Sequence, residues 1–218
     1  MREEKNMKRC VVVCAVVLLL AAFAAGPVMA AVDFDLGIKA GVSMATYKWT
    51  DEAASKSLTK PVFGVFFAYN INRNFAIQPE IYYLTQGGTW EEVYDSTTYK
   101  YVDYDNYLHI PVLAKYRFMP DKKLTPILFA GPAMGFLLSA HYKYFLDGVE
   151  EWDKDVKSYL KKTNFSVVFG GGVEYKMDKL MLILDVRYDL GLTNIDGLND
   201  PTDALKLRAL MFMVGVGF

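Results

Sequence analysis

The amino-acid sequence predicts an all-β protein: an eight-stranded antiparallel up-and-down transmembrane β-barrel with short periplasmic turns and long extracellular loops. Three observations lead to this prediction. Apolar and polar residues alternate in eight segments of roughly ten residues, which is the length that a tilted strand needs to cross a bilayer. The connections between these segments are alternately long and short. The chain ends on an aromatic residue, Phe218, that continues an alternating apolar pattern.

Composition excludes several other classes of protein. The 218 residues are 53% hydrophobic and 15% aromatic, which fits one all-β domain and excludes a disordered chain. Lys and Arg number 24 and Asp and Glu 25, a net charge of −1, which argues against a nucleic-acid-binding protein. Beyond residue 30 no apolar stretch reaches about 18 residues, so the sequence does not predict a helical membrane protein.

Residues 1–30 have the order of a secretory signal peptide. Four basic residues precede residue 10, and the run Cys10–Ala25 carries no charge. This run is too short for a typical membrane-spanning helix, and small residues precede the expected cleavage site after Ala30. Both cysteines lie in the signal, so the predicted outer-membrane β-barrel domain, residues 31–218, contains no disulfide.

The first four segments place apolar side chains on one face and polar or small ones on the other, with a period of two residues. Pro79 and Pro111 stand within the third and fourth segments. Because proline cannot donate to the hydrogen-bond ladder, we predict a β-bulge at each proline. The segments are residues 33–44, 62–70, 75–86 and 107–118.

The last four segments follow the same pattern with one exception. The fifth is apolar on both faces, so the sequence leaves open which of its faces points into the barrel. The sixth contains Gly170-Gly171-Gly172, which we expect to make room for bulky neighbours, because no Lys-Ser/Thr follows it as in a phosphate-binding loop. The segments are residues 124–139, 165–176, 180–191 and 205–218.

The lengths of the connections indicate which ends of the strands lie together. They alternate between long and short along the whole chain, so all short turns fall at one end of the sheet. Membrane barrels have this asymmetry, with short periplasmic turns and longer extracellular loops. The connections are residues 46–61, 71–74, 87–106, 119–123, 140–164, 177–179 and 192–204.

Aromatic residues on the apolar faces gather near the strand ends, as expected of the two girdles of a membrane barrel. A smaller set near the long loops is Phe63, Tyr83, Phe165 and Tyr188. The predicted interface aromatics at the short-turn ends are Phe34, Tyr69, Phe75, Tyr116, Phe118, Tyr175 and Phe218.

The polar faces carry charged residues that would point into the lumen. Side chains fill the interior of an eight-stranded barrel, and buried charges must be paired because an unpaired one is costly. We therefore interpret these residues as a structural charge network; an ion or proton path is the alternative. The network comprises Lys39, Glu80, His109, Lys115, Arg117, Glu174, Asp185 and Arg187, with Lys176 and Asp189 also facing inward.

Several short motifs resemble those of the porin-like, PorT-like outer-membrane β-barrel family, with its OmpX/OmpA-type eight-stranded architecture. The resemblance covers the whole chain after the signal and implies a barrel rather than a reaction. The family often has a carboxylate at the position of His109, so a family-wide charge pairing is not implied there. The matching stretches are 37–43, 78–83, 108–116, 130–132, 170–175 and 187–192.

The sequence predicts no catalytic, cofactor-binding or metal-binding residues. We expect a non-enzymatic monomer with a structural or surface-binding role, whose partners are outer-membrane lipid, the barrel-assembly machinery during insertion, and an extracellular ligand or protein at the loops. The alternatives are an accessory barrel in transport or secretion, as the resemblance implies, a narrow ion channel, a lipid-modifying enzyme built on Ser139 and His141, and a soluble secreted barrel.

The second and third long connections are rich in aromatic residues. Asp147-Gly148 is a hairpin-turn signal, so these connections are expected either to extend the barrel wall as hairpins or to pack against one another. Exposed Tyr and Trp are also common in binding surfaces. The residues are Trp90, Tyr94, Tyr99, Tyr101, Tyr104, Tyr142, Tyr144, Phe145, Trp152 and Tyr159.

Overall fold

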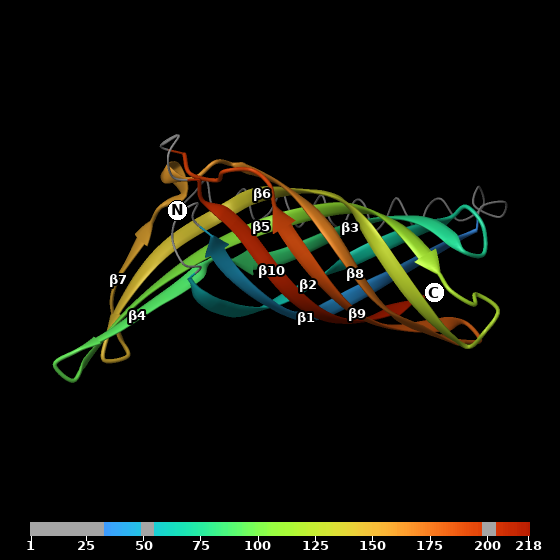
Figure 1. The fold of residues 1–218 in the computed structure, drawn as a ribbon, viewed down its shortest axis with the longest axis horizontal. Helices are drawn as coiled ribbons and strands as arrows, with labels where there is room; N and C mark the ends of the chain where they lie inside the picture. Colours follow the sequence, from blue (N-terminus) through green and yellow to red (C-terminus); the bar gives the residue numbers. More distant parts are fainter. Residues whose placement is uncertain (1–32, 49–54, 198–203) are drawn as a thin grey trace, which may run out of the picture. The chain divides into compact units, whose positions relative to one another are not determined.

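The computed structural model of the chain describes residues 33–48, 55–197 and 204–218. The predicted signal peptide and its cleavage site lie outside these residues. Within them no helix is long or apolar enough to cross a membrane. The strands (Figure 1) are β1 (Phe34–Lys48), β2 (Lys56–Asn70), β3 (Phe75–Gln86), β4 (Gly88–Tyr94), β5 (Thr97–Arg117), β6 (Leu124–Leu146), β7 (Val149–Asp155), β8 (Thr163–Met177), β9 (Leu180–Gly191) and β10 (Lys206–Gly217), with a short 3₁₀ helix, η2 (Lys157–Tyr159).

Eight of the strands form a closed antiparallel ring. Each pairs with its neighbours in the order β1, β2, β3, β5, β6, β8, β9 and β10. The ring closes where β10 pairs with β1, from Gly37 opposite Gly217 to Lys48 opposite Lys206. This closure confirms the predicted up-and-down barrel and removes the free strand edges that an open sheet would expose.

Alternation of burial follows the period of two that the sequence predicts. On β10, Met211 and Met213 are buried inside the ring while Phe212 and Val214 are exposed outside it. On β6 the structure settles the parity: Phe129 and the small residues that follow it at every second position face inward.

Beyond the ring, β4 and β7 turn the second and third long connections into hairpins. β4 pairs with β5 and β7 with β6, and the hairpins extend past the barrel strands (Figure 1). Positive φ angles at both turn residues, 49° and 67° at Asp95 and Ser96 and 47° and 83° at Asp147 and Gly148, suit a tight two-residue hairpin turn. β5 and β6 are therefore much longer than the sequence pattern indicated.

The prediction of a bulge at each proline was wrong. Pairing between β2 and β3 lapses beside Pro79 but resumes in the same register at Ile77, and pairing between β3 and β5 does the same beside Pro111. Each proline leaves a local gap in the ladder without inserting an extra residue. The register shift in this part of the sheet lies instead between β5 and β6, where Asn106 and Tyr107 pair with Ser139 and Leu137, so that Leu138 of β6 is the extra residue.

The outer surface of the ring is apolar across its middle. Exposed side chains such as Ile38, Phe63, Leu184 and Val214 cover it, an arrangement that burial in lipid would stabilise. We call this zone the apolar band. At the hairpin end its last apolar residues are Met44, Tyr83, Leu108 and Leu210. Two positions nearer the hairpins on the same strands the residues are polar: Thr46, Thr85, Asn106 and Arg208.

Glycine on the inner face makes room for large lumen side chains. A Cβ atom on Gly170 would lie 2.8 Å from Phe129 Cζ and still closer to the Val186 carbonyl oxygen. The neighbouring Gly171 faces outward, where an added Cβ would meet the flexible end of Leu128 at 2.9 Å.

We therefore expect Gly170→Ala to lower the free energy of unfolding by about 1–3 kcal/mol, the usual cost of overpacking. Gly171→Ala is the matched control and should cost clearly less, because Leu128 can move. Urea unfolding in phospholipid vesicles measures both. Equal losses in the two variants would contradict the assignment of Gly170 as a packing residue.

Candidate functional site

The centre of the lumen holds a four-residue ion-pair cluster. Lys39 Nζ lies 2.7 Å from Asp185 Oδ2 and 3.3 Å from Glu80 Oε1. Arg187 donates to Glu80 Oε2 at 2.6 Å and to both oxygens of Asp185, at 2.8 and 2.9 Å. All four side chains are at most 2% exposed. Each charge thus meets two opposite charges, and the four residues come from three strands, β1, β3 and β9.

Aromatic rings enclose the two cations of this cluster. The Arg187 guanidinium lies 5.3 Å from the centre of the Tyr82 ring and 4.9 Å from that of Phe129. Lys39 Nζ lies 5.2 Å from the Phe66 ring. These cation–π contacts add to the ion pairs and fill the space between them.

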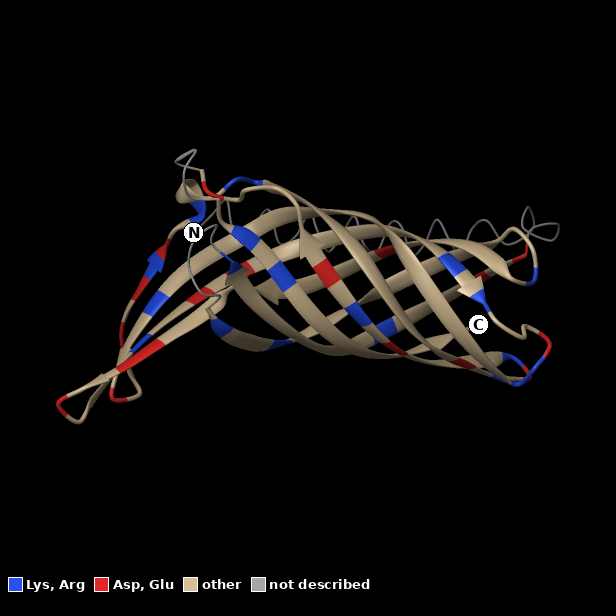
Figure 2. Ribbon diagram, in the orientation of Figure 1, with Lys and Arg blue, Asp and Glu red and all other residues tan. Residues whose placement is uncertain are grey.

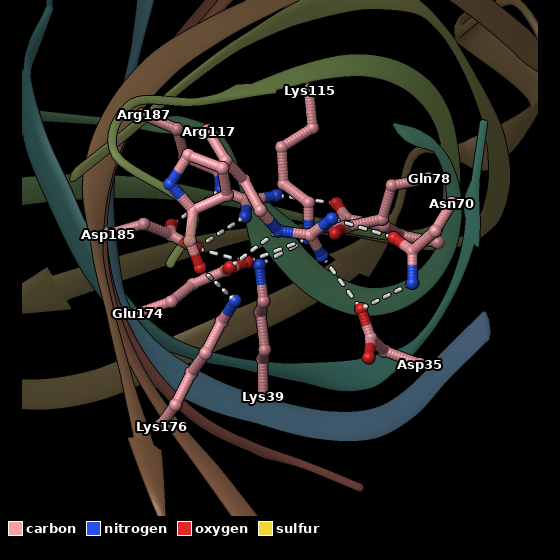
Figure 3. Close-up of polar contacts among 12 residues, drawn as sticks. Asp35, Lys39, Asn70, Gln78, Lys115, Arg117, Glu174, Lys176, Asp185 and Arg187 are labelled. Carbon is pink, nitrogen blue, oxygen red and sulfur yellow. Dashed lines mark hydrogen bonds and ion pairs between the residues drawn. The ribbon is translucent and has the colours of Figure 1, made fainter. Parts of the chain in front are cut away.

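A second cluster lies toward the short turns. Glu174 accepts from Lys115 Nζ and from Arg117 Nε, each at 2.7 Å. The remaining nitrogens of Arg117 donate to Asn70 and Asp35, also at 2.7 Å. Figure 3 shows these side chains converging with the central cluster. The two clusters together balance four cations against four carboxylates.

Toward the hairpin end the lumen holds a third group of buried polar side chains, around His109. His109 Nε2 lies 3.2 Å from Asp189 Oδ2 and 3.3 Å from Ser166 Oγ, and Gln86 donates to the same carboxylate at 3.4 Å. All eight residues of the predicted charge network therefore lie in the lumen, but His109 is not joined to the central cluster. The sequence pattern also placed Lys176 inward, and its Nζ reaches the Pro120 carbonyl oxygen at 2.8 Å.

The predicted interface aromatics lie outside the ring at its short-turn end. Phe34 and Tyr69 are register partners, and the Phe75 and Tyr116 rings contact each other at 4.8 Å. Phe218 is 63% exposed. In the set near the long loops, Phe63 stacks on Tyr83. Tyr188 contacts Phe169, a residue that was not among the predicted interface aromatics.

Sequence reasoning missed two neighbouring carboxyls beyond the apolar band, the buried Asp105 and the half-buried Asp103. Asp105 is 0% exposed and accepts a hydrogen bond from the Tyr47 hydroxyl. Burial raises its pKa to about 7. Burial and the nearby Asp105 together raise the pKa of Asp103 to about 8. The sequence pattern placed residues 87–106 in a connection rather than a strand, so neither carboxyl was assigned to a face, although Asp105 shares the inward face of Tyr107 and His109.

Four aromatic side chains form a ladder on one face of the projecting hairpins. Tyr101 contacts the rings of Tyr142 and Tyr144 at 5.9 and 5.0 Å. Trp152 contacts the same two rings at 5.3 and 5.6 Å. Cross-strand aromatic pairs of this kind stabilise a sheet, so β5, β6 and β7 are joined well beyond the apolar band. We call these four residues the aromatic ladder.

The two residues considered for catalysis have separate partners. Asn106 donates to Ser139 Oγ at 2.9 Å, while His141 Nδ1 lies 2.8 Å from Asp153 Oδ1. No hydrogen bond between Ser139 and His141 is present among the described residues, so the structure does not assemble a nucleophile with its base. Nor does any group of three or more His, Cys, Asp or Glu side chains in the described ranges have the geometry of a metal site.

Comparison with known proteins identifies the family. The model of a family described as outer membrane protein beta-barrel domain matches residues 29–197. A comparison with curated proteins found no match.

Solved structures of outer-membrane proteins are similar at low sequence identity. Neisserial surface protein A is 17% identical, with 84% of this chain and 95% of that chain covered and a TM-score of 0.45. Ail, the attachment invasion locus protein of Yersinia pestis, solved with the heparin analogue sucrose octasulfate, is 13% identical, with 85% and 99% covered and a TM-score of 0.42. A major outer membrane protein from Thermus thermophilus is 9% identical, with 85% and 99% covered and a TM-score of 0.49.

Arg187→Met should lower the free energy of unfolding by about 3–5 kcal/mol, because it leaves Glu80 and Asp185 with one shared cation in a buried site. The matched control is Arg73→Met at the short turns. Arg73 pairs with Asp121, but their side chains are 80% and 75% exposed, so this change should cost about 0–1 kcal/mol. Urea unfolding in lipid vesicles compares the two, and a similar cost would contradict a structural role for the lumen network.

The carboxyl carbon of Asp103 should titrate near pH 8 in the folded protein, far above the usual value near 4. Asp105→Asn should lower this pKa by removing the neighbouring charge, while burial keeps it above its ordinary value. Carbon-13 NMR of selectively labelled aspartate in lipid nanodiscs measures the titration. A midpoint near 4 in the unmodified protein would show that Asp103 is solvated.

Proposed function

This chain belongs to the outer-membrane β-barrel protein family, and from that premise we propose that it is a non-enzymatic outer-membrane protein with a side-chain-filled lumen. Its role is structural or surface-binding, and the hairpins beyond the apolar band contact the partner. The observation that carries the proposal is the pairing of lumen charges in a ring of only eight strands.

The lumen network supports a closed barrel rather than a transport path. Lys39 binds two carboxylates across the interior, and Arg187 binds one across it and one on its own strand. The central side chains are at most 2% exposed. Moving an ion through this layer would require separating buried ion pairs, which is strongly unfavourable. Barrels with a diffusion channel have about twice as many strands.

The hairpins support a surface role. In barrels of this class the long connections are extracellular, so β4, β7 and the adjoining halves of β5 and β6 would project outside the cell. Tyr94 at one hairpin end is 77% exposed. Exposed aromatic side chains on a stiff support are typical of recognition surfaces.

Lipid and the assembly machinery are the proposed partners within the membrane. The exposed outer residues of the ring would contact acyl chains. Strand β10 leads to the exposed aromatic side chain of Phe218, and the barrel-assembly machinery is the partner that we propose for insertion of these strands. The closed ring has no free edge among the barrel strands, which supports a monomer.

Accessory function in transport or secretion, as PorT-like resemblance implies, is the second candidate, and a narrow ion channel the third. A lipid-modifying enzyme has one observation in its favour: Asp153 could orient His141, two residues from Ser139. A Ser139→Ala or His141→Ala change that alters the lipid A composition of the outer membrane would favour the enzyme over our proposal.

Planar-bilayer recording tests the filled lumen. The purified protein should show no stepwise conductance across physiological voltages, because the central ion pairs close the interior. Lys39→Ala/Arg187→Ala should increase ion leakage if the barrel still folds, which heat-dependent gel migration checks. Discrete openings in the unmodified protein would replace our proposal with the ion-channel alternative.

A further inference from the structure

We propose that the lumen side of the projecting hairpins binds a small organic ammonium ion. This inference rests on the proposed surface-binding role and names the chemistry of the ligand. We call the residues that would hold the ion the inner hairpin face. They are Trp90, Tyr101, Asp103, Asp105, Tyr142 and Trp152.

Strand pairing places these side chains on the same side of the hairpin sheet. Trp90 on β4 is opposite Tyr101 on β5, and Asp103 on β5 is opposite Tyr142 on β6. Residues that are directly opposite in an antiparallel pair point to the same face. Along β5 every second residue from Tyr101 to the buried Tyr107 shares that face. The inner hairpin face therefore continues the inner wall of the barrel.

The two carboxyls of this face lack a cation. Asp105 is 0% exposed, and its Oδ2 accepts a hydrogen bond from the Tyr47 hydroxyl. Its other oxygen, Oδ1, has no hydrogen-bond partner among the residues that the structure describes. Neither Asp105 nor Asp103 forms an ion pair within the described part of the chain. A buried carboxylate oxygen without a partner is costly, so the missing component is a positively charged group.

Aromatic rings lie on both sides of this carboxyl pair. The Tyr47 ring stacks on Trp90 with 5.9 Å between the ring centres, while the Tyr47 hydroxyl reaches Asp105. Beside Asp103, Tyr142 belongs to the aromatic ladder. The faces of aromatic rings carry partial negative charge and attract cations, and cages of such rings recognise quaternary ammonium groups.

The chemistry of the face favours an organic cation over a metal ion. Divalent metal ions prefer several oxygen ligands, and no group of three or more His, Cys, Asp or Glu side chains in the described ranges could hold one. The aromatic ladder already accepts an ammonium group of the chain itself, because Lys154 Nζ lies 4.6 Å from the centre of the Trp152 ring. A methylated ammonium ion could contact ring faces and carboxylates together.

The inner hairpin face is open to a ligand from solution. Tyr101, Asp103 and Tyr142 are each partly exposed. Figure 2 shows acidic residues on both hairpins, and residues 88–101 and 142–155 contain eight acidic residues and three lysines. This excess of negative charge would draw a cation toward the hairpins. Lipid contacts the opposite face of the barrel strands, so the ligand is a soluble ion rather than a lipid headgroup.

Isothermal titration calorimetry of the full chain in a polyoxyethylene detergent, with empty micelles as reference, measures the binding. The probes are choline, the neutral analogue in which a tert-butyl group replaces the trimethylammonium group, and glucose. We expect saturable binding of choline, binding of the neutral analogue that is weaker by about tenfold because it lacks the charge, and no binding of glucose.

Choline should bind more tightly as the pH rises from about 6 to about 9, because the cation stabilises the ionised carboxyls. Burial raises the pKa of Asp105 to about 7, and burial together with Asp105 raises that of Asp103 to about 8. Bound choline should in turn lower the pKa of Asp103, which carbon-13 NMR of labelled aspartate measures. The other titratable groups around the carboxyls are Tyr47 on β1, Tyr107 on β5, Tyr142 on β6 and Lys154 on β7.

Asp103→Asn and Tyr142→Leu should each weaken choline binding by about fivefold, the effect of losing one charge contact or one ring face. The matched controls are Glu91→Gln and Tyr104→Leu, which change the neighbours of Trp90 and Asp103 on the opposite face of the same strands. Both controls should leave choline binding unchanged. Heat-dependent gel migration checks that every variant folds.

Equal affinity for choline and its neutral analogue, equal loss in the variants of the two faces, or saturable binding of glucose without binding of choline would each overturn the inference. These outcomes are separate from failure of the proposed function. A conducting barrel would end the filled-lumen proposal whether or not choline binds, and a silent barrel that does not bind choline would end only the present inference.

Discussion

The constraint on which this structure depends is the narrow interior of an eight-stranded ring whose outside faces lipid. Such a ring has room only for side chains, and its polar face must turn inward because the outward one is apolar. Every buried charge then requires an opposite charge within the same layer. The central cluster meets this requirement by pairing two cations, Lys39 and Arg187, with two carboxylates, Glu80 and Asp185. These ion pairs connect β1, β3 and β9, which are not joined to one another by backbone pairing.

Size matters in the lumen as much as charge. Arg187 and Phe129 are large, and they fit side by side because β8 offers Gly170 opposite them. The glycines of β8 and the ion pairs therefore depend on each other. The small residues on β8 leave the space that the long cationic side chains of other strands occupy. The paired charges and the packed rings together occupy the middle of the lumen, which is what the proposed closed barrel requires.

Much of this could be predicted from sequence, because a period of two residues is a direct consequence of strand geometry. That pattern identified the eight barrel strands and the inward position of Lys39. It failed where the period is interrupted. On β6 the extra residue Leu138 moves the inward face from Leu137 to Ala140. Asp105 was missed because the pattern ended the strand at residue 107 and placed residues 87–106 in a connection. The stagger of each strand relative to its neighbours decides which charges pair and why His109 is separate from the central cluster. No local sequence pattern encodes that stagger.

The register shift at Asn106 marks the boundary between two physical environments along β5. From Asn106 toward the short turns, β5 lies in the membrane-spanning wall, and its inward charges have partners. From Asn106 toward the hairpins, β5 continues into water, where contact with lipid no longer requires an apolar outer face and charged residues are tolerated. Because the aromatic ladder stiffens this extension, it can hold exposed carboxylates and Tyr94 at a fixed distance from the membrane. The proposed surface-binding role therefore falls to the part of the chain that the membrane does not constrain, while the barrel holds that part in place.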